Sequence, residues 1–187
     1  MALKFEYNKE ALTATVCGVD DKSCEEIVIP ATVEYCEKDY KVTSIGFEAF
    51  KDCTRLTKVT IGNGVTSIEG SAFLQCFLLK DVTIPDSVTA IGDDAFKGCV
   101  LLKKVAIPDS VTAIGDGAFK ACVSLKEVTI PDSVTSIGSC AFQGIPNIKV
   151  NICNDKDCVI AEDAFESTAK INELGFFKRL FGKNNNN

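Results

Sequence analysis

The chain has 187 residues, of which 46% are hydrophobic and 25% are charged, a composition typical of one globular domain with a substantial core. Its 20 basic and 26 acidic side chains give a formal net charge of −6. This charge disfavours nonspecific binding to a phosphate backbone, so nucleic acid is not an expected partner.

Residues 1–16 carry scattered charges and lack the apolar run of about 7 to 15 residues that a secretory signal needs. No later stretch approaches the roughly 18 to 20 apolar residues that span a bilayer. The sequence therefore favours a cytoplasmic protein. The alternative is a cell-surface or secreted location, if a signal was removed from a longer precursor.

Residues 1–26 are expected to form a β-hairpin that caps one end of the fold. Two segments rich in apolar and β-branched side chains, 5–7 and 12–16, flank the turn-like stretch 8–11. A stack of repeats needs such a cap, because its terminal coils have no neighbour on one side.

Residues 27–168 repeat with an offset of 23 residues, in about six coils. One column of isoleucines and one of phenylalanines run through all of them, and an alanine precedes each phenylalanine. Such coincidences predict stacked coils whose equivalent side chains form continuous ladders in the core. The columns are Ile45, Ile68, Ile91, Ile114, Ile137 and Ile160, and Phe50, Phe73, Phe96, Phe119, Phe142 and Phe165.

Each coil contains two short segments with the alternation of a strand. Residues 79–84 follow the pattern L-x-x-V-x-I and end at a Pro-Asp pair, which predicts a strand and then a turn. Residues 88–91 follow V-x-x-I and predict a second extended segment. Residues 94–97 are expected to form a tight helical or 3₁₀ turn.

Two coils depart from the pattern. The first carries an insertion at residues 34–41, which we interpret as an irregular loop where binding specificity could lie. In the last coil Val150 and Ile152 come one residue early, which predicts a local bulge or a register slip. The phase recovers at Ile160.

Residues 169–183 carry apolar side chains at helical spacing, with lysine and arginine around them. We expect an amphipathic helix that caps the other end of the stack. The alternative is a helix that contacts a membrane surface or a partner protein. Residues 184–187 form a polar tail of asparagines.

The coil pattern L-x-x-V-x-I-P-x-x-V-x-x-I-G-x-x-A-F-x-x-C resembles the BspA-like class of leucine-rich repeats, from Ile27 to about Ser167. The resemblance implies a right-handed, β-rich leucine-rich-repeat solenoid with short strands stacked into parallel sheets. It also implies a role in adhesion or protein binding, as in surface proteins of bacteria and in large families of anaerobic protists.

The ten cysteines fall into two groups. Four follow the phenylalanine at the repeat period, and we expect them to be reduced thiols packed in the core. Six others occupy dissimilar places, and whether they form disulfides stays open. The first group is Cys53, Cys76, Cys99 and Cys122, and the second is Cys17, Cys24, Cys36, Cys140, Cys153 and Cys158.

The sequence offers no pattern for a metal, a cofactor or catalysis. A zinc site needs four converging ligands and typically a C-x₂-C pair, but this chain has neither such a pair nor any histidine. The lack of histidine removes the commonest general base, and no glycine motif for phosphate binding is present. We therefore expect no metal, no cofactor and no enzymatic activity.

The residues between the apolar positions of the first strand should point outward, side by side across coils. They include a row of lysines that could receive an acidic partner surface, although a charged face can also serve solubility alone. The candidate binding residues are Lys58, Thr60, Lys80, Asp81, Thr83, Lys103, Lys104, Lys126, Glu127 and Thr129.

The sequence therefore predicts a non-catalytic module of the adhesion or scaffold type that binds a protein. One alternative is a structural component packed into a larger assembly, and another is a surface adhesin. The second strand carries a threonine row that we expect to favour lateral packing. Its members are Thr66, Thr89, Thr112 and Thr135.

Overall fold

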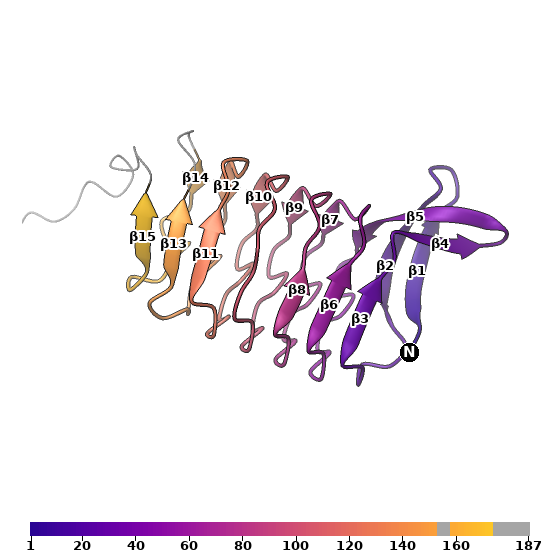
Figure 1. The fold of residues 1–187 in the computed structure, drawn as a ribbon, viewed down its shortest axis with the longest axis horizontal. Coiled ribbons are helices and arrows are strands. Elements are labelled where there is room, and N and C mark those ends of the chain that lie inside the picture. The colour runs from indigo at the N-terminus through magenta and orange to yellow at the C-terminus, as the bar shows by residue number, and fades with distance from the viewer. Residues whose placement is uncertain (153–157, 174–187) are drawn as a thin grey trace, which may run out of the picture.

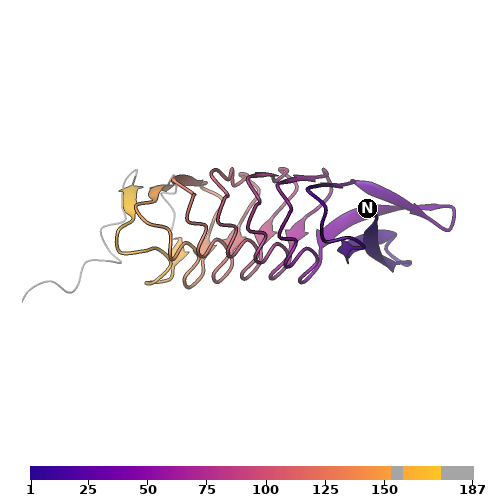
Figure 2. The same cartoon turned by 90° about the horizontal axis from the view of Figure 1, so that it is seen from below.

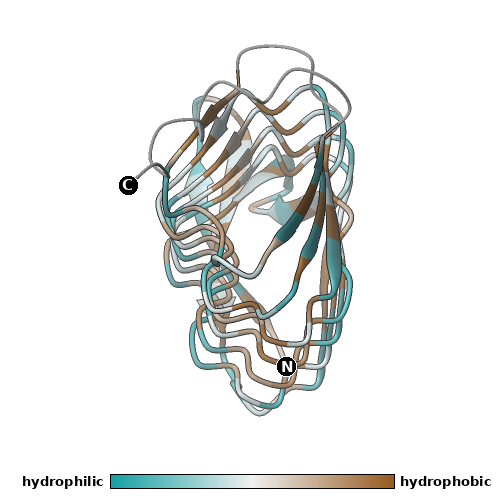
Figure 3. Cartoon of the chain, turned by 90° about the vertical axis from the view of Figure 1, so that its left-hand side faces the viewer, coloured by the Kyte–Doolittle hydropathy of each residue, from teal (hydrophilic) through white to brown (hydrophobic). Residues whose placement is uncertain are grey.

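The computed structural model describes residues 1–152 and 158–173, and it shows an elongated solenoid whose coils stack along one axis (Figures 1 and 2). In the view along that axis the coils superimpose, and strands line two sides of the outline (Figure 3). The strands are β1 (Leu3–Asn8), β2 (Thr13–Val19), β3 (Glu26–Ile29), β4 (Thr32–Tyr35), β5 (Lys38–Ile45), β6 (Lys58–Ile61), β7 (Ser67–Ile68), β8 (Asp81–Thr83), β9 (Ala90–Ile91), β10 (Ala113–Ile114), β11 (Glu127–Ile130), β12 (Ser136–Ile137), β13 (Lys149–Ile152), β14 (Val159–Ile160) and β15 (Lys170–Glu173).

One side of the solenoid is a nine-stranded sheet in the order β1-β2-β5-β7-β9-β10-β12-β14, with β4 paired to β5. The other side, which we call the strand face, holds two three-stranded sheets, β3-β6-β8 and β11-β13-β15. Segment 103–107 lies between them and is drawn without an arrow in Figure 1. Parallel pairing of Val59 with Val82 and of Ile68 with Ile91 confirms the 23-residue repeat.

The phenylalanine ladder forms the centre of the core, as predicted. Its ring centroids lie 5.1–5.3 Å apart with interplanar angles of 5–15°, so the rings stack nearly parallel. The rings from Phe50 to Phe142 are fully buried, whereas Phe165 is half-buried. Each coil also donates a backbone N–H to the next, as from Phe96 to the Ala118 carbonyl at 2.8 Å.

The described residues contain no helix, so the predicted helical or 3₁₀ turn after the second strand is wrong. In the first coil Glu48 and Asp52 adopt positive φ values of 55° and 60°, which interrupt any helical run. Their N–H groups donate instead to the next coil, at the carbonyls of Gly70 and Leu74. The turn is therefore held by hydrogen bonds between coils as well as by isolated bonds within the coil, such as that from the Lys51 N–H to the Glu48 carbonyl at 3.1 Å.

The N-terminal segment is a hairpin, because β1 and β2 pair antiparallel. β2 then pairs in parallel with β5, so the hairpin extends the nine-stranded sheet. The insertion 34–41 is also regular, and its interpretation as an irregular loop is wrong. β4 and β5 form a second hairpin with Cys36 and Glu37 at its turn, and the Tyr35 ring stacks on the Tyr7 ring at 4.3 Å.

The register slip in the last coil is confirmed. Val150 pairs with Val128 and Ile152 with Ile130, an offset of 22 residues, so both side chains stay buried. The helix predicted for residues 169–183 is wrong where it can be compared, because β15 is a strand that pairs in parallel with β13. The backbone of β13 offers that strand its hydrogen bonds, which override local helical spacing. Residues 174–183 and the tail 184–187 lie outside the described residues.

Candidate protein-binding face

The structure places all ten candidate residues on the strand face, but it does not place all of them on strands. Six lie on β6, β8 and β11, while Lys80 and Lys126 come directly before β8 and β11. The strand expected at Lys103 and Lys104 is absent, so that part of the prediction is wrong. Nine of the ten side chains are exposed and one is half-buried.

The strand face is interrupted at segment 103–107. In the described chain no backbone hydrogen bond joins this segment to β8 or β11. Ala106 stands where the neighbouring coils carry threonine, which favours strands more strongly. Ile84 and Ile107 beside the break are each 8% exposed, against 0% for Ile130. A hollow of about 580 Å³ opens here, lined by residues that include Lys103, Lys104, Ala106, Lys126, Glu127 and Thr129.

A column of alternating charge crosses the face. Lys58 pairs with Asp81 and Glu127 pairs with Lys149, so neighbouring coils place opposite charges side by side. Lys58, Asp81, Lys104 and Glu127 were predicted as binding residues without their alternation being recognised, although the 23-residue offset places these four in one column. The alternation runs through Glu26, Lys58, Asp81, Lys104, Glu127 and Lys149, and it ends where Lys170 pairs with Lys149.

Glu127 anchors a polar network at the C-terminal end of this column. Its carboxylate accepts hydrogen bonds from Lys149 Nζ at 2.8 Å and from Asn151 Nδ2 at 2.6 Å. These two hydrogen bonds hold the pKa of the Glu127 carboxyl below its ordinary value. Asn172 Nδ2 in turn donates to Asn151 Oδ1 at 3.1 Å. The network could not be predicted from the repeat, because Asn151 leaves the 23-residue register.

Two rows of like charge border the strand segments in three successive coils. The lysine row comes before the strand segments and the aspartate row follows them, in the turns after proline. All six side chains are exposed, and none takes part in a salt bridge within the part of the chain that the structure describes. The lysine row is Lys80, Lys103 and Lys126, and the aspartate row is Asp86, Asp109 and Asp132.

The threonine row, whose members come directly before β7, β9, β10 and β12 of the nine-stranded sheet, has a structural role. Each hydroxyl donates to the backbone carbonyl of the equivalent residue one coil earlier, at 3.1–3.2 Å. Thr89 Oγ1, for example, donates to the Thr66 carbonyl. The hydroxyls therefore reinforce the stacking of coils, and the row is explained without a partner.

The cysteine ladder is packed in the core as predicted, and its thiols also make hydrogen bonds. Cys76 Sγ donates to the Phe50 carbonyl at 3.2 Å, and the two following coils repeat the contact at 3.3 and 3.1 Å. Burial raises the pKa of Cys53 to about 11 and that of Cys122 to about 12. All four ladder thiols are free, as are the other described cysteines, and Cys153 lies outside the described residues.

The ladder thiols should resist alkylation in the native protein. Because the thiolate is the nucleophile, thiols that are buried and protonated react slowly. We expect iodoacetamide at pH 8 to label Cys36, which is exposed, but not Cys76 or Cys99 until the chain is denatured. Peptide mass spectrometry measures this pattern, and equal labelling of Cys36 and Cys99 in the native protein would contradict it.

The same burial predicts how stability depends on pH. Folding raises the pKa of Cys53 and of Cys122 above 9.0, so the native state retains protons that the unfolded chain releases. Their contribution to stability is therefore complete below about pH 9 and is lost as the pH rises towards 12.

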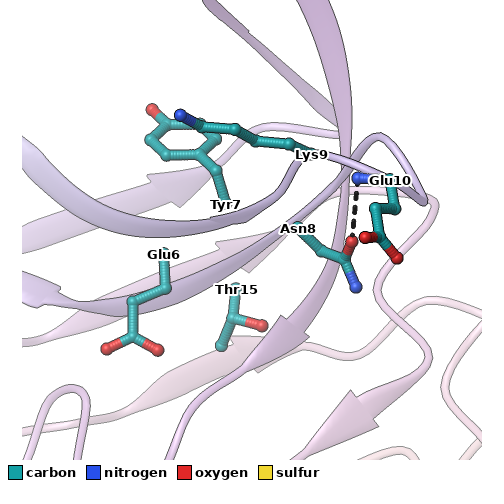
Figure 4. A pocket seen from close by; sticks show the side chains of 6 residues that line it. All are labelled: Glu6, Tyr7, Asn8, Lys9, Glu10 and Thr15. Atoms are coloured by element: carbon teal, nitrogen blue, oxygen red, sulfur yellow. Dashed lines mark hydrogen bonds between the residues drawn. The ribbon is translucent and has the colours of Figure 1, made fainter.

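A second hollow, of about 550 Å³, lies at the N-terminal hairpin (Figure 4). Asn8 caps its turn, because Asn8 Oδ1 accepts hydrogen bonds from the N–H groups of Glu10 and Ala11 at 3.1 and 3.0 Å. The carboxylates of Glu6 and Glu10 lie apart and do not converge. Among the described residues, no group of three or more His, Cys, Asp or Glu side chains could hold a metal ion.

In the described part of the chain, no helix is long and apolar enough to cross a membrane. Among curated proteins, none matches the chain. Solved structures with the same fold do match. A leucine-rich repeat protein from Bacteroides ovatus is 34% identical, with a TM-score of 0.73, and the match covers 90% of this chain and 42% of that one.

Two further structures support the same fold. A leucine rich cell surface protein from Faecalibacterium prausnitzii is 32% identical, with a TM-score of 0.68 and coverage of 91% of this chain and 52% of that one. The T. pallidum Leucine Rich Repeat protein shares the fold at 24% identity, with a TM-score of 0.72 and coverage of 90% and 83%. The chain thus spans about half or less of the B. ovatus and F. prausnitzii proteins.

The repeat itself matches a known family over most of the chain. The match is to the BspA type Leucine rich repeat region, in six copies, over residues 20–149 and 66–182. The stacked ladders and the parallel register described above agree with that match. This chain therefore belongs to the BspA-type leucine-rich repeat family.

Proposed function

We propose that this protein is a non-catalytic protein-binding module whose strand face receives an acidic surface. The lysine row carries the proposal, since it presents three exposed cations that form no salt bridge with any described residue. Adjacent coils lie about 4.8 Å apart, so the three charges act on one small area of a partner. Charge of this kind guides association and selects partners of opposite sign.

The rigidity of the face supports the same function. The side chains beneath it are buried, and on either side of segment 103–107 backbone pairing between coils holds its strands, so little ordering of these parts is needed when a partner binds. Repeat solenoids commonly use such extended surfaces for binding. The alternating column beside the lysine row limits the net charge of the rest of the face.

Two observations favour different locations for this module. The buried, free thiols of the cysteine ladder favour the cytoplasm, where cysteines stay reduced. The F. prausnitzii protein, by contrast, is described as a cell surface protein, which favours a surface adhesin. A count of free thiols distinguishes the two locations, when the protein is purified in its native state and then denatured for the count. Ten free thiols support the cytoplasm, and six or fewer support the cell surface.

Charge reversal tests the binding function. The triple variant Lys80→Glu, Lys103→Glu and Lys126→Glu should weaken capture of partner proteins by the immobilised chain at least tenfold, or about 1.4 kcal/mol. The partners are identified and quantified by mass spectrometry from a lysate of the source cells and from its surface fraction.

A matched control carries Lys4→Glu, Lys9→Glu and Lys120→Glu, away from the strand face. Each triple variant lowers the formal net charge by six, from −6 to −12, so a general charge effect acts on both alike. We expect the control to keep capture within twofold of the wild type. Equal losses in both variants, or no loss in the first, would overturn the proposal.

A further inference from the structure

The two charge rows occupy the same three coils. The lysine row and the aspartate row both begin in the coil of β8 and both continue to the coil of β11. One coil earlier the equivalent positions are neutral, with Thr57 and Asn63. The recurring turn explains why aspartate follows each proline. It does not explain why the lysines occur in the same three coils as these aspartates.

The rows also match each other in spacing. Within a coil, as from Lys103 to Asp109, the two charges are six residues apart, about 20 Å along an extended strand segment. Between coils both rows advance by the same step, about 4.8 Å. The strand face therefore has a positive border and a negative border of equal length and equal period.

We propose that the strand face binds a second copy of this chain, with the lysine row of each copy against the aspartate row of the other. The two solenoid axes run parallel and the strands of the two copies run antiparallel. The inference rests on the proposed function, since it names the partner of the same face. The pairing is isologous, so it closes as a dimer.

The charges select this arrangement over the other face-to-face dimer. In the proposed dimer the two-fold axis is parallel to the solenoid axis and passes along the column of Ala106. Rotation about this axis places Lys103 of one copy opposite Asp109 of the second copy. A two-fold axis parallel to the strands would instead bring lysines opposite lysines, which is repulsive. The first arrangement therefore satisfies both rows at once.

The centre of the face suits this contact. In the proposed dimer the central column of one chain faces the central column of the other, and the side chains of this column are small. The alternating column at Asp81, Lys104 and Glu127 meets the prolines of the turns, so no like charges are opposed. The central column consists of Thr83, Ala106 and Thr129.

The dimer should be weak and sensitive to salt. Seven coil segments at about 4.8 Å, each about 20 Å long, give a face of about 670 Å². A standard interface buries about 800 Å² per partner, so this area is at the low end. We expect dissociation in the micromolar range, about tenfold weaker in 500 mM than in 50 mM NaCl, because the charges lie at the solvent-exposed border.

Sedimentation velocity on two charge-swapped variants tests the pairing. One variant is Lys80→Glu, Lys103→Glu and Lys126→Glu, and the other is Asp86→Lys, Asp109→Lys and Asp132→Lys. Each alone should be monomeric, because its two borders carry the same sign. An equimolar mixture should form a one-to-one dimer, and a chain with all six changes should dimerise again.

The aspartate changes should leave the fold intact, because these exposed side chains make no hydrogen bond in the described chain and such turns accept most residues. Circular dichroism verifies this for every variant. A wild type that stays monomeric to 200 µM in 50 mM NaCl, or a mixture without a mixed dimer, would overturn the inference. If the wild type is monomeric while the lysine variant loses partner capture, the proposed function stands and the self-association fails.

Discussion

Phe96→Ala is expected to lower the free energy of unfolding by about 3 to 5 kcal/mol, the largest effect of any single change considered for this fold. The Phe96 ring is fully buried and stacks on Phe73 at 5.1 Å and on Phe119 at 5.3 Å. Its removal leaves a cavity in the middle of the ladder and breaks both stacking contacts. Since each coil contacts only its neighbours, the break should also split one cooperative transition into two.

Urea unfolding followed by circular dichroism measures this loss, because the chain has no tryptophan to report by fluorescence. Phe165→Ala is the matched control. That ring is half-buried and stacks on Phe142 at 5.3 Å, so the same change should cost roughly half as much. Equal losses at Phe96 and Phe165 would show that the interior of the ladder is not what stabilises the solenoid.

Gly115→Ala is expected to cost about 2 to 4 kcal/mol, through overpacking and the loss of one hydrogen bond. A Cβ atom at this position would lie 2.6 Å from the Asp93 backbone nitrogen and 2.7 Å from the Gly92 carbonyl carbon, and it would also collide with Asp93 Oδ1. That carboxylate oxygen accepts the Asp116 N–H at 2.8 Å. The backbone of the earlier coil must therefore move, and the bond between coils is lost.

Gly70→Ala separates this clash from the general effect of replacing glycine. Its new Cβ atom would approach the Phe47 ring at 3.3 Å, and that side chain is 67% exposed and free to move. We expect a change within about 1 kcal/mol. The same urea unfolding experiment compares the two variants, and a cost at Gly70 equal to that at Gly115 would contradict the steric explanation.

Much of the core could be predicted from the 23-residue offset alone. Equivalent residues of a solenoid contact one another, so the ladders through Phe96 and Cys99 followed directly from the columns. The slip at Val150 was also readable, since a buried strand keeps its apolar face inward. The handedness and the domain boundaries given above stay predictions.

The errors came from contacts that local patterns do not contain. The turn at Glu48 depends on a positive φ and on hydrogen bonds to the next coil, neither of which residue spacing reveals. Residues 170–173 fit a helix or a strand, and the edge of β13 decided between them. The insertion 34–41 forms a hairpin because Tyr35 packs on Tyr7, which is distant in the sequence.

The candidate face was predicted only in outline. Its residues share one side of the solenoid, but the break at segment 103–107 depends on weak strand propensity within an otherwise regular sheet. The pairing of Glu127 with Lys149 depends on the shortened offset of the last coil. These are effects of neighbouring coils on one another, and a single repeat does not display them.

The hydrogen bonds between coils also have a consequence for how this protein evolves. Because Phe73, Phe96 and Phe119 each donate to an alanine carbonyl one coil further on, every coil presents its neighbour with the same donors and acceptors. Unequal recombination within the gene can therefore add or delete a whole coil while the new junction remains compatible on both sides. An event that involves one of the three coils from β8 to β11 lengthens or shortens both charged borders together, so the number of such coils can tune the affinity proposed for the surface.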